Sequence, residues 1–149
     1  MRKNRLSRML VLAACCSFAG ALLHLGCIWF GAAWYRWLGA GEAIARMAAA
    51  GEAYPTVITL CIAGILLVWG GYALSGAGVL PRLPLLRIAL CAITAFYLLR
   101  GLAFAPMQIW FPGRSTAFWW WSSTICFTFG VLHLAGLRQV WSRIQTRDR

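Results

Sequence analysis

The stretch TVITLCIAGILLVWGGYAL, residues 56–74, contains no charged side chain and directly follows Pro55. A helix of about 20 apolar residues is long enough to cross the hydrocarbon core of a bilayer, and proline is well placed at the start of such a helix. A helix in a soluble bundle instead has one apolar stripe and one polar face. Because residues 56–74 are apolar on every side of a helix, they predict a membrane span.

Three further apolar runs predict three further spans. They cover approximately residues 9–34, 85–104 and 118–137. The whole chain, residues 1–149, is then a single transmembrane domain. We therefore expect an all-α fold, in the form of a membrane-embedded four-helix bundle.

The composition agrees with a lipid-facing exterior. Hydrophobic residues make up 62% of the chain and charged residues only 11%, whereas about a quarter of the residues in soluble domains are charged. The formal net charge of +11 would often indicate nucleic-acid binding. Here the basic residues occupy the chain ends and short loops and form no basic helix face. We expect membrane lipids as partners, and no nucleic acid.

The basic residues also predict the orientation, because cytoplasmic loops of membrane proteins are rich in Lys and Arg. With four spans, both chain ends and the loop between the second and third spans share one side. The basic residues on that side are Arg2, Lys3, Arg5, Arg8, Arg82, Arg87, Arg138, Arg143, Arg147 and Arg149. Both glutamates, Glu42 and Glu52, lie on the opposite side. We expect a multi-pass protein of the bacterial inner (cytoplasmic) membrane with cytoplasmic termini.

A cleaved signal peptide is an alternative interpretation of the first span, because residues 12–15, LAAC, resemble a lipoprotein cleavage site. Six apolar residues separate Arg8 from Cys15, which is shorter than the apolar region of about 7–15 residues in signal peptides. The sequence therefore favours a permanent anchor.

Two segments on the outer side differ from simple loops. Residues 41–50 are alanine-rich and place Glu42 and Arg46 at positions i and i+4, which predicts a short interfacial helix in the first outer loop. Residues 105–116 contain two prolines and a glycine, which predicts an irregular segment.

Small residues recur at helical spacing in three spans and predict the faces on which the helices pack. They are Ala13, Ser17 and Ala21 in the first span, Gly64, Gly71 and Ser75 in the second, and Ser122, Cys126 and Gly130 in the fourth. His24 continues the first face and His133 continues the last. Both histidines are therefore expected to point into the bundle.

Depth argues against a haem or metal ion shared by these histidines. The first span runs outward and the fourth inward, so His24 and His133 should differ in depth by roughly 13 Å at a rise of about 1.5 Å per residue. We expect each to be neutral and hydrogen-bonded to a neighbouring helix. The six cysteines lie within apolar runs and form no Cys-x-x-Cys pair, which is typical of small buried hydrophobic residues.

Arg100 lies about one turn inside the outer end of the third span, where a lone guanidinium is unfavourable unless it reaches the headgroups or pairs with an acid. We predict an outer-leaflet cluster of Arg100 with Glu42 or Glu52. Its lining would be His24, Tyr97 and the run Trp119–Trp121. Three interpretations stay open: an arginine that only reaches the headgroups, a structural ion pair, and a ligand-binding or catalytic pocket.

Two short segments, WGGYALSGAG at residues 69–78 and YLLRG at residues 97–101, resemble segments of uncharacterised small proteobacterial inner-membrane proteins. The order of four spans, a structured first outer loop and a short inner loop resembles the DoxX-like group of small bacterial membrane proteins. This resemblance is one of architecture and implies a four-span fold. Some DoxX-like proteins are associated with quinone-linked electron transfer, although a shared fold does not by itself establish function.

The chain has no Gly-rich phosphate loop, no His-Glu-x-x-His motif and no intramembrane Asp, which are signatures of common catalytic and transport sites. We therefore expect an accessory or interaction subunit that binds another membrane protein or a second copy of itself, rather than an enzyme. The sequence specifies no cofactor. The alternative is a binder of a lipid, quinone or other amphipathic small molecule at an outer-leaflet pocket around Arg100. A third hypothesis is a redox protein that uses His24, His133 or the cysteines.

Overall fold

The computed structural model describes residues 6–110 and 113–145. Every regular element in these residues is an α-helix, which confirms the predicted all-α class. The helices are α1 (Arg8–Phe30), α2 (Ala32–Trp37), α3 (Glu42–Ala49), α4 (Ala53–Ala77), α5 (Leu86–Leu102), α6 (Phe104–Trp110) and α7 (Thr116–Gln145).

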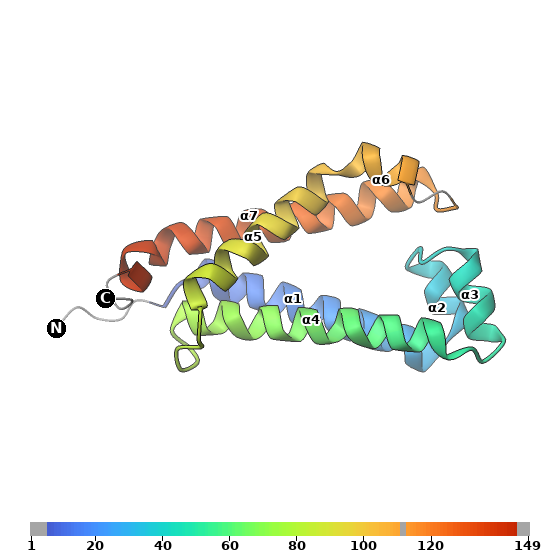
Figure 1. Cartoon of the computed structure of the whole chain (residues 1–149), viewed down its shortest axis with the longest axis horizontal. Helices are drawn as coiled ribbons and strands as arrows, with labels where there is room; N and C mark the ends of the chain where they lie inside the picture. Colours follow the sequence, from blue (N-terminus) through green and yellow to red (C-terminus); the bar gives the residue numbers. More distant parts are fainter. Residues whose placement is uncertain (1–5, 111–112, 146–149) are drawn as a thin grey trace.

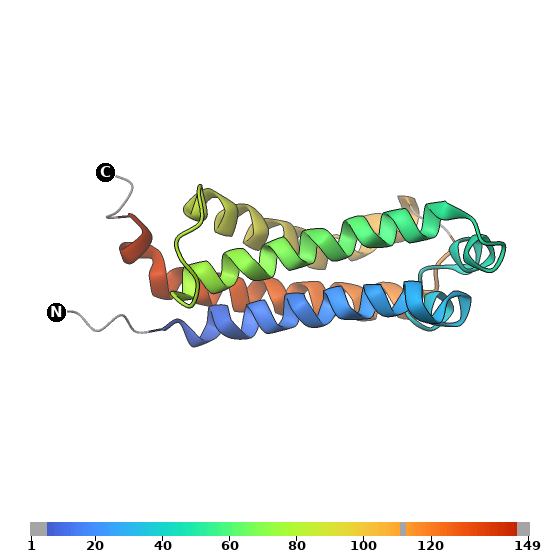
Figure 2. The same ribbon diagram turned by 90° about the horizontal axis from the view of Figure 1, so that it is seen from below.

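The four long helices form two pairs, α1 with α4 and α5 with α7 (Figure 1). The turned view in Figure 2 shows that all four follow the long axis of the molecule. The pairs meet at the end where α1 begins and α7 ends, which we call the terminal end. All four helices contribute to the hydrophobic core there, through Leu10, Ala14, Ala73, Ala77, Leu86, Leu90, Leu137, Val140 and Ile144.

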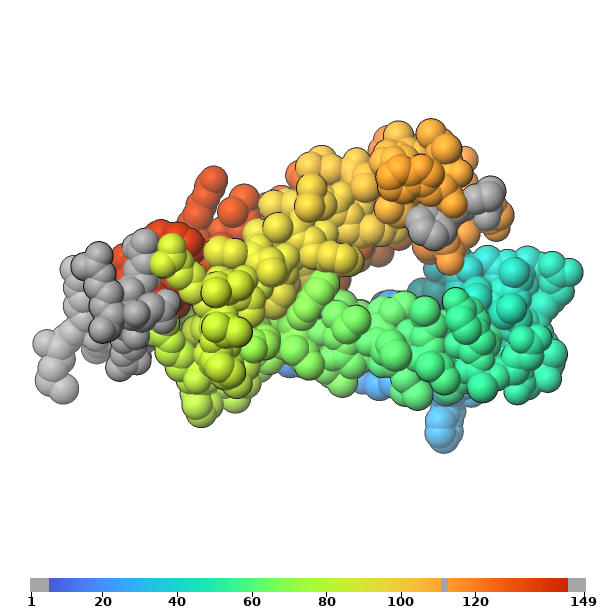
Figure 3. Space-filling view, viewed as in Figure 1, coloured from blue at the N-terminus to red at the C-terminus, as the bar shows by residue number. Residues whose placement is uncertain are grey.

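Toward the opposite end, the distal end, the two pairs diverge and leave an opening between them (Figure 3). The short helices α2 and α3 lie at this end beside α4. Their buried centre contains Cys27, Tyr35 and Ala45. The Tyr35 hydroxyl donates to the backbone oxygen of Pro55 at 3.1 Å, so α2 is tied to the start of α4.

Two helices, α1 and α4, are long and apolar enough to cross a membrane. The number rises to three if α5 and α6, which meet at a bend of 72°, are counted as one broken span. The fourth predicted span, residues 118–137, lies within α7. That helix has 30 residues, but its serines, threonines, tryptophans and His133 lower its mean hydropathy, and it is not among the candidates found in the described residues.

Several predicted boundaries differ from the helix ends. The first run, residues 9–34, is interrupted by Gly31, whose φ of +71° ends α1 at Phe30. Helix α4 extends beyond residues 56–74 at both ends. The short interfacial segment is helical, as predicted, over α3.

The prediction of an irregular segment at residues 105–116 is wrong for residues 105–110, which belong to α6. Pro106 is the third residue of α6. Proline is tolerated in the first helical turn because the backbone N–H groups there have no intrahelical acceptor. Residues 111–112 of the predicted segment lie outside the described residues.

The packing face predicted for α1 is confirmed, because Ala13, Ser17 and Ala21 are all fully buried. The face predicted for α4 is wrong for Gly64, which is exposed. The buried face of α4 instead includes Gly70, where an added Cβ would lie 2.5 Å from the Phe18 ring of α1. The absence of a side chain at Gly70 is what allows this ring to approach the α4 backbone.

Large apolar side chains are exposed on all four long helices. Examples are Leu22 and Trp29 on α1, Val57 and Val68 on α4, Ile88 and Leu99 on α5, and Trp121 and Ile125 on α7. Contiguous apolar surface of this extent is unusual on a soluble monomer.

Candidate binding site around Arg100

Arg100 lies in the last turn of α5 and its guanidinium bonds to α7. Nη1 donates to the Ser123 hydroxyl at 3.1 Å, and Nη2 donates to the Ser122 hydroxyl at 3.0 Å. The planar guanidinium presents donors in a fork, which here spans two adjacent serines of one helix. Arg100 therefore points toward the neighbouring helix of its own pair.

Glycine brings the two backbones close enough for these bonds. A Cβ added at Gly101 would lie 2.7 Å from the backbone nitrogen of Phe127 on α7. One added at Gly130 would lie 2.8 Å from the Leu98 side chain on α5. Close approach at small residues is the usual way in which helices associate in lipid.

Trp119 lies between two arginines and is only 3% exposed. The Cζ atom of Arg100 is 5.3 Å from its ring centroid, and the Cζ atom of Arg114 is 5.8 Å from it. Both distances are within the range of cation–π attraction. Arg114 also donates from Nε to the backbone oxygen of Ala40 at 3.3 Å. We define the Arg100 site as Arg100, Arg114, Trp119, Ser122 and Ser123.

A small pocket adjoins this site. It has a volume of about 250 Å³ and lies between the loop that joins α2 to α3 and the start of α7. Arg114 lines it together with Arg36, Glu42 and Phe118. Arg114 therefore connects the pocket to the buried indole of Trp119.

The acids predicted to pair with Arg100 lie elsewhere. Arg36 donates from Nε and Nη2 to the two carboxylate oxygens of Glu42, both at 2.9 Å. The hydrogen bond from this guanidinium lowers the pKa of Glu42. Glu42 thus pairs with Arg36 and not with Arg100, which differs from the prediction. Glu52 is exposed and immediately precedes α4, where a negative charge interacts favourably with the helix dipole.

His24 and Tyr97 contact other groups. Nδ1 of His24 bonds to the backbone oxygen of Gly20 at 2.7 Å, within its own helix. Tyr97 lies one turn from Arg100 on α5, and its hydroxyl is 3.1 Å from the Ser17 hydroxyl of α1. Of the residues predicted from sequence, the structure therefore joins Arg100 and Trp119 directly, places Tyr97 one turn away, and separates Glu42, Glu52 and His24 from them.

His133 is fully buried, as its position on the small-residue face predicts. Its Nδ1 donates to the backbone oxygen of Phe129 at 2.8 Å, because a carbonyl oxygen can only accept. The prediction of hydrogen bonds to neighbouring helices is therefore wrong for both histidines, each of which bonds to its own helix. Nε2 of His133 has no hydrogen-bond partner within the described part of the chain.

The redox hypothesis stays a prediction. All six cysteines lie in the described residues and have free thiols. In residues 6–110 and 113–145, no group of three or more His, Cys, Asp and Glu side chains is placed to hold a metal ion.

Sequence reasoning missed Arg114 and the role of the two serines. The serines could have been noticed in the sequence. Ser122 and Ser123 are adjacent polar residues within the apolar run 118–137, and the run 85–104 contains Arg100.

No protein-family model matches this chain, and neither does any curated protein or any solved structure. The DoxX-like resemblance of the architecture therefore stays a prediction.

Proposed function

We propose that this chain is a multi-pass inner-membrane protein with cytoplasmic termini that binds an amphipathic molecule with an anionic headgroup at the Arg100 site. In this proposal α1, α4, the bent pair α5–α6, and α7 are four spans of one bundle. The length and apolar character of α1 and α4 support it, as do the exposed apolar side chains of all four long helices. The distal end then faces the outer leaflet.

The binding proposal rests on the groups that contact the Arg100 guanidinium. Two serine hydroxyls and one indole surround its guanidinium, and all three partners are neutral. An arginine near the end of a span is stabilised by a counter-charge. Since Arg36 already binds Glu42, an anionic oxygen of a ligand is the natural counter-charge for Arg100.

The hydrogen-bonding capacity of the guanidinium fits this role. An arginine side chain carries five N–H donors, of which Ser122 and Ser123 accept two. The remaining donors can bind a phosphate or carboxylate group with charge-assisted hydrogen bonds. Arg114, 5.8 Å from the same indole, adds a second positive charge. Leu99, next to Arg100 along α5, is exposed and offers apolar surface for the apolar part of such a molecule.

Mass spectrometry of the molecules that co-purify with the protein tests this proposal. The protein is extracted in a mild detergent, and wild type, Arg100→Gln and Arg46→Gln are compared. Arg46 is the matched control because it is an exposed arginine of α3 at the same end. We expect more anionic amphiphile with wild type and with Arg46→Gln than with Arg100→Gln. Equal amounts in all three proteins would contradict the proposal.

A second candidate function, an accessory subunit, is favoured by the outward face of α4. An added Cβ at Gly64 or Gly71 would meet no described atom within 4 Å. Two glycines on one open helix face offer a close-packing surface for a helix of another membrane protein or of a second copy. The molecular mass in mild detergent tests this function: a complex that Gly64→Leu disrupts supports it, and a lone monomer argues against it.

A further inference from the structure

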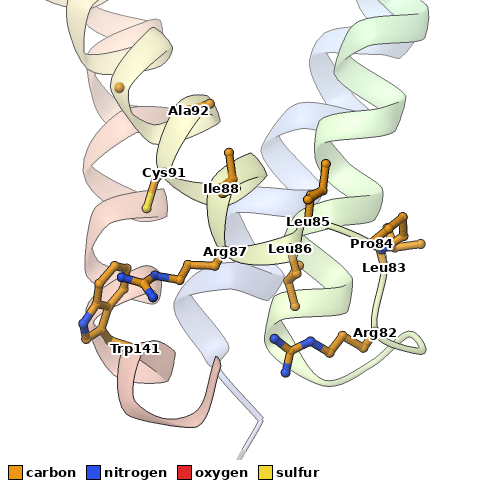
Figure 4. A pocket seen from close by; sticks show the side chains of 11 residues that line it. Arg82, Leu83, Pro84, Leu85, Leu86, Arg87, Ile88, Cys91, Ala92 and Trp141 are labelled. Carbon is orange, nitrogen blue, oxygen red and sulfur yellow. The ribbon is translucent and has the colours of Figure 1, made fainter. Parts of the chain in front are cut away.

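A second basic site lies at the terminal end, at the opposite end of α5 from Arg100. A groove of about 1180 Å³ is bounded by the loop that precedes α5, by the first turns of α5 and by Trp141 of α7. Figure 4 shows its lining: Arg87 of α5 extends toward Trp141, Arg82 lies on the loop that precedes α5, and the apolar residues Leu85, Ile88 and Ala92 also line the groove. No part of the proposed function depends on this groove.

Two arginines line the charged side of the groove, and Arg87 is held there by a neutral ring. The Cζ atom of Arg87 is 4.7 Å from the ring centroid of Trp141, which is a cation–π geometry that orients the guanidinium without neutralising it. Arg82 donates to the backbone oxygen of Ile144 at 3.1 Å. The two acids within the described residues, Glu42 and Glu52, belong to the distal end, so an anion bound beside Arg87 would meet no repulsion from them.

The other side of the groove is apolar and exposed. Leu85 is 72% exposed and Ile88 is 66% exposed. Ile88, Ala92 and Ala95 follow one another at i, i+4 and i+7 on α5 and all line the groove. This stripe runs along the helix away from Arg87, and the small alanine side chains leave room on it for an acyl chain.

The start of α5 adds to the positive potential. The residue before the helix is Leu85, and no side chain caps the first turn. The first backbone N–H groups of an α-helix have no intrahelical acceptor and form the positive end of the helix dipole. These groups lie beside Arg87, the second residue of α5, so they reinforce the positive charge of its guanidinium at the groove.

We infer that this groove is a binding site for one anionic phospholipid of the inner leaflet, with the phosphate at Arg87 and an acyl chain along Ile88 and Ala92. The combination of a cationic end and an apolar stripe matches the two parts of such a lipid. A zwitterionic lipid would lack the net charge, and inorganic phosphate would leave the apolar stripe uncovered. This inference rests on the proposed membrane location but not on the Arg100 site.

Native mass spectrometry of the delipidated full-length protein tests the inference. Phosphatidylglycerol, phosphatidylcholine with the same acyl chains and inorganic phosphate are added separately to wild type and to Arg87→Gln. The removal of one interfacial charge should weaken phosphatidylglycerol binding by about fivefold. Arg138→Gln is the matched control, because Arg138 is an exposed arginine of α7 outside the groove. It should leave the affinity unchanged.

A second variant keeps the test decisive if Arg87→Gln folds poorly. Ala92→Trp fills the apolar stripe at an exposed position without changing any charge, and it should also weaken phosphatidylglycerol binding. Circular dichroism of both variants establishes that they remain helical. Arg100→Gln should leave binding at this groove intact, which separates a failure here from a failure of the proposed function. Equal losses with Arg87→Gln and Arg138→Gln, no loss with Ala92→Trp, or equal affinity for phosphatidylcholine would each overturn the inference.

Discussion

The guanidinium of Arg100 donates a hydrogen bond to the hydroxyl of Ser123 at 3.1 Å, across the interface between α5 and α7. The neighbouring Ser122 accepts a second bond from the same guanidinium. A charged side chain that bonds to neutral hydroxyls keeps its full charge, so this contact both holds the two helices together and preserves an electrostatic site for a ligand.

Removal of both hydroxyls should therefore destabilise the helix pair. The double variant Ser122→Ala, Ser123→Ala leaves the Arg100 guanidinium without these two acceptors. We expect a loss of about 1–3 kcal/mol in the free energy of unfolding, measured by denaturation in mixed detergent micelles. Thr128→Ala is the control, because the Thr128 hydroxyl bonds to the Thr124 backbone oxygen of its own helix and is exposed. A loss as large in the control would argue against a role for the guanidinium contacts.

Two glycines of α4 should respond differently to alanine. At Gly70 a new Cβ would lie 2.5 Å from the Phe18 ring, whereas at Gly64 it would meet no described atom within 4 Å. Gly70→Ala should lower the free energy of unfolding by about 1–3 kcal/mol through overpacking. Gly64→Ala should change it by at most about 1 kcal/mol, because alanine favours the helix. Similar unfolding free energies for the two variants would show that α1 and α4 do not pack on the Gly70 face.

The pKa of Glu42 should depend on Arg36. Its carboxylate accepts two hydrogen bonds from Arg36, which lower its pKa below the ordinary value. The stabilisation from this pair is therefore fully present above the ordinary pKa of about 4.3, and it is lost as the pH falls through the lowered value. NMR titration of the Glu42 carboxyl carbon should show a higher pKa in Arg36→Gln. Arg46→Gln should raise it less, since Arg46 acts on Glu42 only through its charge. An unchanged pKa in Arg36→Gln would be inconsistent with the observed pair.

The two ends of the molecule should lie on opposite sides of the membrane. Single cysteines at Ala49 of α3 and at Val79 in the loop after α4 occupy exposed positions at the distal and terminal ends. In a variant without the native cysteines, a membrane-impermeant maleimide should label Ala49→Cys in intact spheroplasts. Val79→Cys should react only after the membrane is permeabilised. Reaction of both residues in intact spheroplasts, or of Val79→Cys alone, would contradict the proposed orientation.

The sequence allowed the helical class and the short helix at α3 to be predicted, because apolar runs and an i, i+4 charge pair are local signals. It also located Arg100 and Trp119 as candidates. The partners of Arg100 were not predictable in this way, because the register of α5 on α7 depends on the close approach at Gly101 and Gly130. That approach is a tertiary contact with no signature in either helix alone.

The pairing of Glu42 with Arg36 could not be predicted from the sequence for a related reason. Between α2 and α3 the chain turns through Gly39 and Gly41, whose φ angles are +77° and +96°. This turn brings Arg36 within 2.9 Å of Glu42. A pairing six residues apart across a turn is not implied by helical spacing, which instead favoured Arg46 as the neighbour of Glu42.

The selection of an anionic headgroup by Arg100 should be visible in the ratio of two affinities. Native mass spectrometry measures the binding of phosphatidylglycerol and of phosphatidylcholine with identical acyl chains to the Arg87→Gln protein, in which the inner groove is weakened. We predict a preference for the anionic lipid of about fivefold or more, which falls toward parity when Arg100→Gln is added and persists when Arg46→Gln is added instead. An unchanged preference after the loss of Arg100 would show that Arg100 does not select the headgroup.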